Sequence, residues 1–171
     1  ARVIFLLSAS EEDVERIKRS NFHCDSMGNL ERGGVQDYER TESSARNYGC
    51  WTIIVDSYAV KNGFVEKLRN GGFRVVVIND DTHGPSSAHV LINGGAHAQQ
   101  LPYEPAEGDT QFLLGTRYAL LRQQFWNVSA KEISPAVNNV LLCVGGDDPL
   151  GVMPQLVRQL DTTINKKCIF N

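Results

Sequence analysis

The chain has no run of about 18 apolar residues, and its N-terminal apolar segment, residues 3–7, is much too short to cross a bilayer. No signal-peptide cleavage pattern follows that segment, so we expect a cytoplasmic protein with no membrane insertion. The 17 basic and 20 acidic residues give a formal charge of −3 and form no basic stripe, which argues against nucleic acid as a partner. Internal repeats and low-complexity tracts are also absent.

Cysteine and histidine are scarce. The four cysteines are far apart, and each lies in or beside an apolar run, which favours reduced core thiols over disulfides. No pair of the four histidines has the spacing of metal ligands, so we predict no metal site, and we expect no cofactor. A hydrolase would need a general base that titrates near neutrality, and no histidine stands out for that role.

The chain does contain an alternation of apolar runs with helical patterns. We predict strands at 3–7, 22–27, 51–55, 75–78, 90–92 and 140–144, with another beginning at 167, and helices at 11–20, 35–48, 63–69 and 151–160. Most of these strands are apolar on both faces, which is typical of a parallel sheet covered by helices on both sides. The sequence therefore predicts an α/β fold with a doubly wound, Rossmann-like parallel sheet.

The length of 171 residues suffices for one domain and part of a second. Residues 127–139 are polar, contain Pro135 and lack periodicity, so we assign them to a linker. The N-terminal α/β domain then spans residues 1–126, and residues 140–171 begin a C-terminal nucleotide-binding domain.

Polar residues follow the predicted strand ends. Asp56, Ser57 and Tyr58 follow one strand, residues 79–81 the next and Asn93 the one after. Ligands of open parallel sheets bind beyond the carboxyl ends of the strands, so these residues should gather on one rim, together with residues 145–148.

Each of these groups allows two interpretations. Asp56 and Tyr58 could reach a sugar or an attacking water. Alternatively, this segment could be only a helix N-cap with a half-buried tyrosine. Asp80 and Asp81 could hold a ribose or only cap a turn. Gly145 and Gly146 would let the backbone approach a phosphate at the next helix N-terminus, or Asp148 would simply cap that helix. Arg122, with Arg117, could contact phosphate or point to solvent from a helix-like connection over residues 116–125.

Five segments occur in an order that resembles a known family. They are residues 53–58, 77–81, 90–93, 113–125 and 144–149, and Tyr118-Ala-Leu-Leu-Arg122 is the most characteristic block. The order is similar to that of the UDP-sugar hydrolase family of pseudaminic acid biosynthesis and of its relative, the spore coat polysaccharide biosynthesis protein SpsG. The resemblance implies a two-domain GT-B fold, related to the MurG-type glycosyltransferases, with a nucleotide sugar held between the domains.

Members of this family release UDP from an amino-sugar nucleotide by attack of water at the anomeric carbon. The resemblance implies that Tyr58 and Asp56 belong to the catalytic sugar site. Substrate contacts are expected from Asn93, Tyr118, Arg122, Gly145, Gly146 and Asp147. The expected ligand is a UDP-linked amino sugar of surface polysaccharide or glycan precursor synthesis.

The glycine and histidine loop that supplies the family's presumed base has no counterpart in this sequence. We therefore expect a fragment that lacks the first strand and ends early in the second domain. The alternatives are a hydrolase-like protein, a non-catalytic nucleotide-sugar-binding fragment and a GT-B glycosyltransferase. An unfinished second sheet would leave an exposed edge, through which copies of the chain could self-associate.

Overall fold

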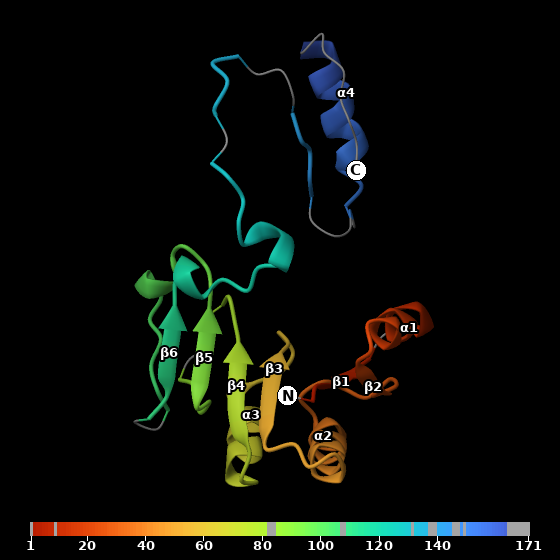
Figure 1. Cartoon of the computed structure of the whole chain (residues 1–171), viewed down its shortest axis with the longest axis vertical. Helices are drawn as coiled ribbons and strands as arrows, with labels where there is room; N and C mark the ends of the chain where they lie inside the picture. The colour runs from red at the N-terminus through yellow and green to blue at the C-terminus, as the bar shows by residue number, and fades with distance from the viewer. Residues whose placement is uncertain are drawn as a thin grey trace. The chain divides into compact units, whose positions relative to one another are not determined.

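The computed structural model describes residues 2–8, 10–81, 85–106, 109–130, 132–136, 140–144, 148 and 150–163. The chain divides into two compact units, residues 1–122 and 123–171. The first unit contains two parallel sheets (Figure 1), and the second contains the helix α4 (Met153–Thr163). The domain and linker boundaries expected from the sequence stay predictions. No helix in the described part of the chain is both long and apolar enough to span a membrane.

The main sheet of the first unit has four parallel strands in the order β3-β4-β5-β6 (Figure 1). These strands are β3 (Thr52–Asp56), β4 (Arg74–Ile78), β5 (Val90–Asn93) and β6 (Gln111–Leu114). The predicted α/β class with a Rossmann-like parallel sheet is thus confirmed. The sequence-based prediction missed β6, because so short an apolar run cannot be told from the start of a helix by periodicity alone.

The apolar core lies on one face of this sheet, under α3 (Asn62–Asn70). Leu68 of α3 and Val75 of β4 are both completely buried there. The helix α2 (Val35–Asn47) packs beside α3 and adds Ala45 to the same core cluster. Because each strand lies next to its predecessor in sequence, right-handed crossovers place the connecting segments on this one face.

The opposite face of the four-stranded sheet is more open. The strand register places Ile54, Val76, Ile78, Ile92 and Leu113 on that face. Ile54 is 63% exposed, whereas the residues on either side of it in β3 turn towards α3. Both faces of the sheet are therefore apolar, but α3 covers one of them and the other is partly exposed.

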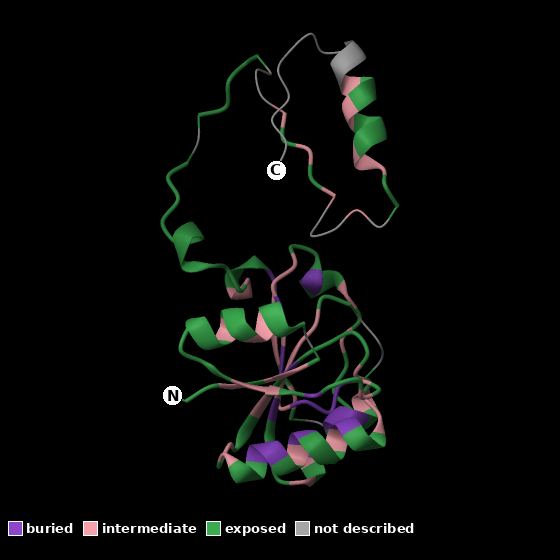
Figure 2. Ribbon diagram, turned by 90° about the vertical axis from the view of Figure 1, so that its right-hand side faces the viewer, coloured by how far each residue is buried: buried purple, intermediate pink, exposed green. Residues whose placement is uncertain are grey.

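A second, two-stranded parallel sheet pairs β1 (Ile4–Leu7) with β2 (His23–Ser26), and α1 (Glu11–Arg19) connects them. The helix α1 begins after Ser10, whose hydroxyl caps it by accepting a hydrogen bond from the Asp13 N–H at 3.2 Å. The helices α1 and α2 lie on opposite sides of this strand pair (Figures 1 and 2). None of the residues of α1 is buried, whereas α2 and α3 carry several buried positions (Figure 2).

One prediction for the C-terminal part of the chain is wrong. Residues 140–144 form no strand, because a strand needs a neighbour for its backbone hydrogen bonds and the described residues of this unit contain none. The connection over residues 116–125, for which a helix-like form was one of two alternatives, contains two short 3₁₀ helices, η2 (Thr116–Tyr118) and η3 (Gln123–Phe125). The strand expected from residue 167 falls outside the described residues.

A polar network around Asp25 connects β2 to α2. The Asp25 carboxylate accepts hydrogen bonds from the Ser44 hydroxyl at 2.9 Å and the Tyr48 hydroxyl at 3.2 Å, and His23 Nε2 lies 3.3 Å away. Burial acts to raise the pKa of Asp25, but the hydrogen bonds from Ser44, Tyr48 and His23 outweigh it and hold this pKa below its ordinary value. The folded chain therefore favours the ionised carboxylate.

A depressed carboxyl pKa contributes stability that is present above the pKa of the unfolded chain and is lost as the pH falls through the folded value. We expect the Asp25→Asn variant to be less stable than the wild type at neutral pH, and this difference to shrink below about pH 4, near the ordinary aspartate pKa. Urea unfolding at a series of pH values measures it. Glu66→Gln, at an exposed position of α3, should leave the profile unchanged. Equal acid sensitivity in Asp25→Asn and the wild type would contradict the network.

Candidate functional site

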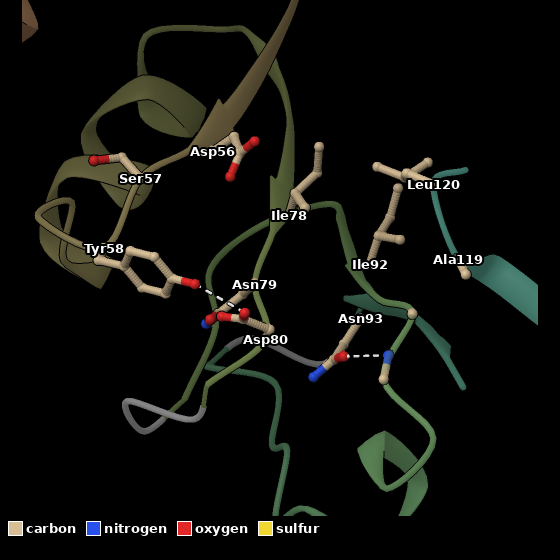
Figure 3. Close-up of a pocket in the computed structure, with 12 residues that line it drawn as sticks. Asp56, Ser57, Tyr58, Ile78, Asn79, Asp80, Ile92, Asn93, Ala119 and Leu120 are labelled. Atoms are coloured by element: carbon tan, nitrogen blue, oxygen red, sulfur yellow. Dashed lines mark hydrogen bonds between the residues drawn. The ribbon is translucent and has the colours of Figure 1, made fainter. Parts of the chain in front are cut away.

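A surface pocket of about 360 Å³ lies at the carboxyl ends of β3, β4 and β5 (Figure 3). Parallel strands end at the same edge of a sheet, so the loops that follow them meet there. The residues that line the pocket are Asp56, Ser57, Tyr58, Ile78, Asn79, Asp80, Ile92, Asn93, Gly94, Gly95, Ala119 and Leu120. Three of the polar segments expected on one rim are thus brought together.

Tyr58 and Asp80 form a hydrogen-bonded polar pair in the pocket. The Tyr58 hydroxyl, on the loop after β3, donates a hydrogen bond of 2.8 Å to Asp80 Oδ2, on the loop after β4 (Figure 3). This hydrogen bond and the negative charge of Asp80 raise the pKa of Tyr58, and the nearby Asp56 and Asp81 carboxylates add to the rise. Tyr58 is therefore a protonated phenol at neutral pH, and it is not a base.

The charge of the pocket is negative. Asp56 and Asp80 are both exposed, and none of the described lining residues is Lys, Arg or His. Such a lining favours hydroxyl, amide or ammonium groups as hydrogen-bond donors and disfavours a phosphate. Among the described residues of the whole chain, no group of three or more His, Cys, Asp or Glu side chains could hold a metal ion.

One wall of the pocket is apolar, which the sequence patterns did not indicate. Ile78 and Ile92 are paired across β4 and β5, and Figure 3 shows them with Leu120 on the same side of the pocket as Asp56. Leu120 is 67% exposed although it is a large apolar residue. The sequence signal for it was the pair Leu120-Leu121 inside the block of residues 118–122.

A close backbone approach holds this wall in place. A Cβ atom at Gly94, directly after β5, would lie 2.5 Å from the Ala119 Cα, so only glycine allows the two segments to touch. Gly115, with a φ of 99°, supplies the turn that sends the chain from β6 back across the sheet edge. These two glycines bring Ala119 and Leu120 into the pocket.

The other predicted substrate contacts are placed differently. Tyr118 is half-buried in η2 and Arg122 is exposed at the end of the first unit, and neither lines the pocket. Asn93 does line it, but its side chain is 2% exposed and is hydrogen-bonded within the protein. Gly145, Gly146 and Asp147 lie outside the described residues.

Asp148 caps the last helix. Its two carboxylate oxygens accept hydrogen bonds from the backbone N–H groups of Val152 and Met153, each at 2.9 Å, at the start of α4. Asp148 thus binds the start of α4 from a distance along the chain, because the helix begins at Met153 and not directly after Asp148. These two N–H groups are satisfied from within the chain and are not presented to a phosphate.

The parallel sheet and the pocket at its carboxyl edge define a protein of the Rossmann-like α/β class. No protein-family model matches the chain. The chain is 22% identical over 167 residues to the uncharacterized protein MJ1062 of Methanocaldococcus jannaschii. This match covers 92% of the chain but 32% of the relative, so the chain spans less than half of that protein's length.

Replacing Asp80 should lower the pKa of Tyr58. In the Asp80→Asn variant, Tyr58 loses both a negative neighbour and a charged hydrogen-bond acceptor, so its pKa should fall towards the ordinary value of about 10. The ¹³Cζ chemical shift of labelled tyrosine, followed against pH, measures this. The control is Asp109→Asn, whose carboxylate pairs with Arg69 before the start of β6. An unchanged Tyr58 titration in Asp80→Asn would rule out the observed pair.

Adding a methyl group at Gly94 should force the pocket wall away. We expect Gly94→Ala to cost about 1–3 kcal/mol of unfolding free energy, the usual range for overpacking, because the new Cβ meets backbone and not a flexible side chain. Gly63→Ala is the matched control, since a Cβ atom there meets nothing within 4 Å and a helical alanine is favoured over glycine. Urea unfolding of both variants measures the difference, and equal stability of the two would contradict the close approach.

Proposed function

We propose that this chain binds a UDP-linked amino sugar and is part of a protein that hydrolyses the bond between the sugar and UDP. The observation that carries the proposal is the pocket at the carboxyl edge of the sheet, whose lining combines carboxylates and a phenol with an apolar wall. The resemblance of five segments to the UDP-sugar hydrolase family supports the substrate class.

The lining of the pocket suits the sugar end of such a substrate. Sugar hydroxyl and amide groups would donate hydrogen bonds to Asp56 and Asp80, and the C–H face of the ring would pack on Ile78, Ile92 and Leu120. The Tyr58 proton is already donated to Asp80, so the Tyr58 oxygen is left as an acceptor for a sugar hydroxyl. The absence of basic groups among the described lining residues argues that the diphosphate lies outside this pocket.

In this proposal, water attacks the anomeric carbon while the bond from that carbon to the diphosphate oxygen breaks. Asp56, an exposed carboxylate at the end of β3, is the acceptor for the proton of the attacking water, and UDP leaves with the bonding electron pair. Tyr58, which its hydrogen bond to Asp80 holds in place, orients the sugar so that its anomeric carbon lies near Asp56.

A binding role without turnover is the second candidate. The observation that favours it is the lack, among the described lining residues, of a histidine or lysine that would titrate near neutrality. Transfer of the sugar to an acceptor other than water would use the same pocket, since one fold can support hydrolysis, transfer or binding alone.

The test measures the binding of UDP-N-acetylglucosamine and of UDP alone to the chain by calorimetry, together with the release of UDP. Asp56→Asn and Tyr58→Phe should each weaken binding of the nucleotide sugar about tenfold, the effect of losing one hydrogen bond of about 1.4 kcal/mol, and leave UDP binding unchanged. Glu66→Gln should change neither.

The outcomes separate the candidates. Release of UDP in water alone supports hydrolysis, binding without release supports the binding role, and release only with an added acceptor supports transfer. Failure of the wild-type chain to bind any UDP-linked amino sugar would sink the proposal, as would equal losses of UDP binding in the pocket variants.

A further inference from the structure

Asn93 is the most internally connected polar side chain of the pocket. It is 2% exposed, its Oδ1 accepts a hydrogen bond from the Gly95 N–H at 2.8 Å, and its Nδ2 donates one to the Tyr103 hydroxyl at 2.8 Å. Its backbone carbonyl accepts a further hydrogen bond from the Gly115 N–H at 2.8 Å. Buried amide groups are costly to leave unpaired, so these contacts hold Asn93 in one orientation.

The contacts of Asn93 connect its own strand end to the end of β6 and to the segment that precedes β6. Gly95 is on the loop that leaves β5, Gly115 directly follows β6, and Tyr103 lies between η1 (Ala98–Gln100) and β6. The Tyr103 hydroxyl, which accepts from Asn93, donates in turn to the backbone carbonyl of Asp81 at 3.4 Å, beyond the end of β4. A chain of hydrogen bonds thus runs from the end of β5 to the residue next to Asp80.

Tyr103 is itself fixed by packing. Its ring stacks on Phe112 of β6, with ring centroids 5.9 Å apart and an interplanar angle of 28°. A rigid ring carries its hydroxyl to a fixed point between Asn93 and Asp81. We call the two hydrogen bonds from Asn93 to Tyr103 and from Tyr103 to Asp81 the relay. Because the ring is fixed, the relay has a defined length and a defined donor direction.

We propose that Asn93 is a positioning residue, which acts through the hydroxyl of Tyr103 to set the place of the Asp80 and Tyr58 pair in the pocket. This inference rests on the proposed function, and it replaces the direct substrate contact expected for Asn93. Asn93 is 2% exposed, and its Oδ1 and Nδ2 are already hydrogen-bonded to the Gly95 N–H and the Tyr103 hydroxyl, so its amide is poorly placed to contact a sugar directly. An amide suits this position because it accepts through Oδ1 and donates through Nδ2, two separate atoms on one planar group.

Two uncharged variants each break one link of the relay. Asn93→Ser keeps an oxygen that can accept from the Gly95 N–H but loses the donor to Tyr103. Tyr103→Phe keeps the stacked ring and removes the hydroxyl. Tyr38→Phe is the matched control, since it removes the same group from α2, where the ring of Tyr38 packs against Phe64 away from the pocket.

Two measurements are made on each variant: the pKa of Tyr58 from its ¹³Cζ shift, and the dissociation constant for UDP-N-acetylglucosamine. In Asn93→Ser and Tyr103→Phe we expect the Tyr58 pKa to fall towards about 10, and the dissociation constant to rise about tenfold. Tyr38→Phe should change neither, although it loses stability of its own. If Asn93→Ser does not fold, Tyr103→Phe still supplies the test.

The outcomes distinguish this inference from the proposed function. An unchanged Tyr58 titration in the relay variants overturns the positioning role, whether or not the sugar binds. A lower Tyr58 pKa with unchanged binding also overturns it, because the position of the pair would then not matter to the substrate. If the wild type binds no nucleotide sugar, the proposed function fails, and the Tyr58 titration still decides whether the relay positions the pair.

Discussion

The parallel pairing of β3 through β6 is the constraint on which the rest of the first unit depends. It makes the strands end at one edge, so residues that are more than twenty positions apart along the chain, such as Tyr58 and Asp80, become hydrogen-bonded neighbours. It also sends each connection over the face that carries α3, which leaves the other face available for the apolar wall of the pocket. Without this pairing, the carboxylates of the rim would be unrelated surface charges.

The α/β class and the meeting of strand ends at one rim could be predicted from the sequence, because both follow from local apolar periodicity and from a general property of parallel sheets. The strand β6 could not, since its three apolar residues lead directly into the connection over residues 116–125, so that the end of a strand is not marked in the sequence. The strand predicted at residues 140–144 failed for a different reason, because apolar residues alone do not supply a pairing partner. The partners of Asn93, which are Gly95, Tyr103 and Gly115, include two long-range contacts that no spacing rule reveals.

A nucleotide sugar needs two kinds of recognition, and the proposed function assigns only one of them to the described pocket. The described pocket is acidic and half apolar, which is suited to a neutral or donor-rich group, and the helix end at Asp148 already has two of its N–H groups satisfied. In the proposed function, diphosphate recognition must therefore come from elsewhere in the protein. A division of this kind gives selectivity, because a ligand that has only the nucleotide gains nothing from the pocket.

The order of the strands also has a consequence for how the sheet assembles. In β3-β4-β5-β6 each strand pairs with its immediate predecessor in sequence, so every closing segment is short and the contact order of the sheet is low for a parallel fold. The sheet can grow one strand at a time during folding. The contact between Gly94 and Ala119 requires β6 and the turn at Gly115 to be in place first. The pocket wall should therefore be the last part of this unit to form and the first to open.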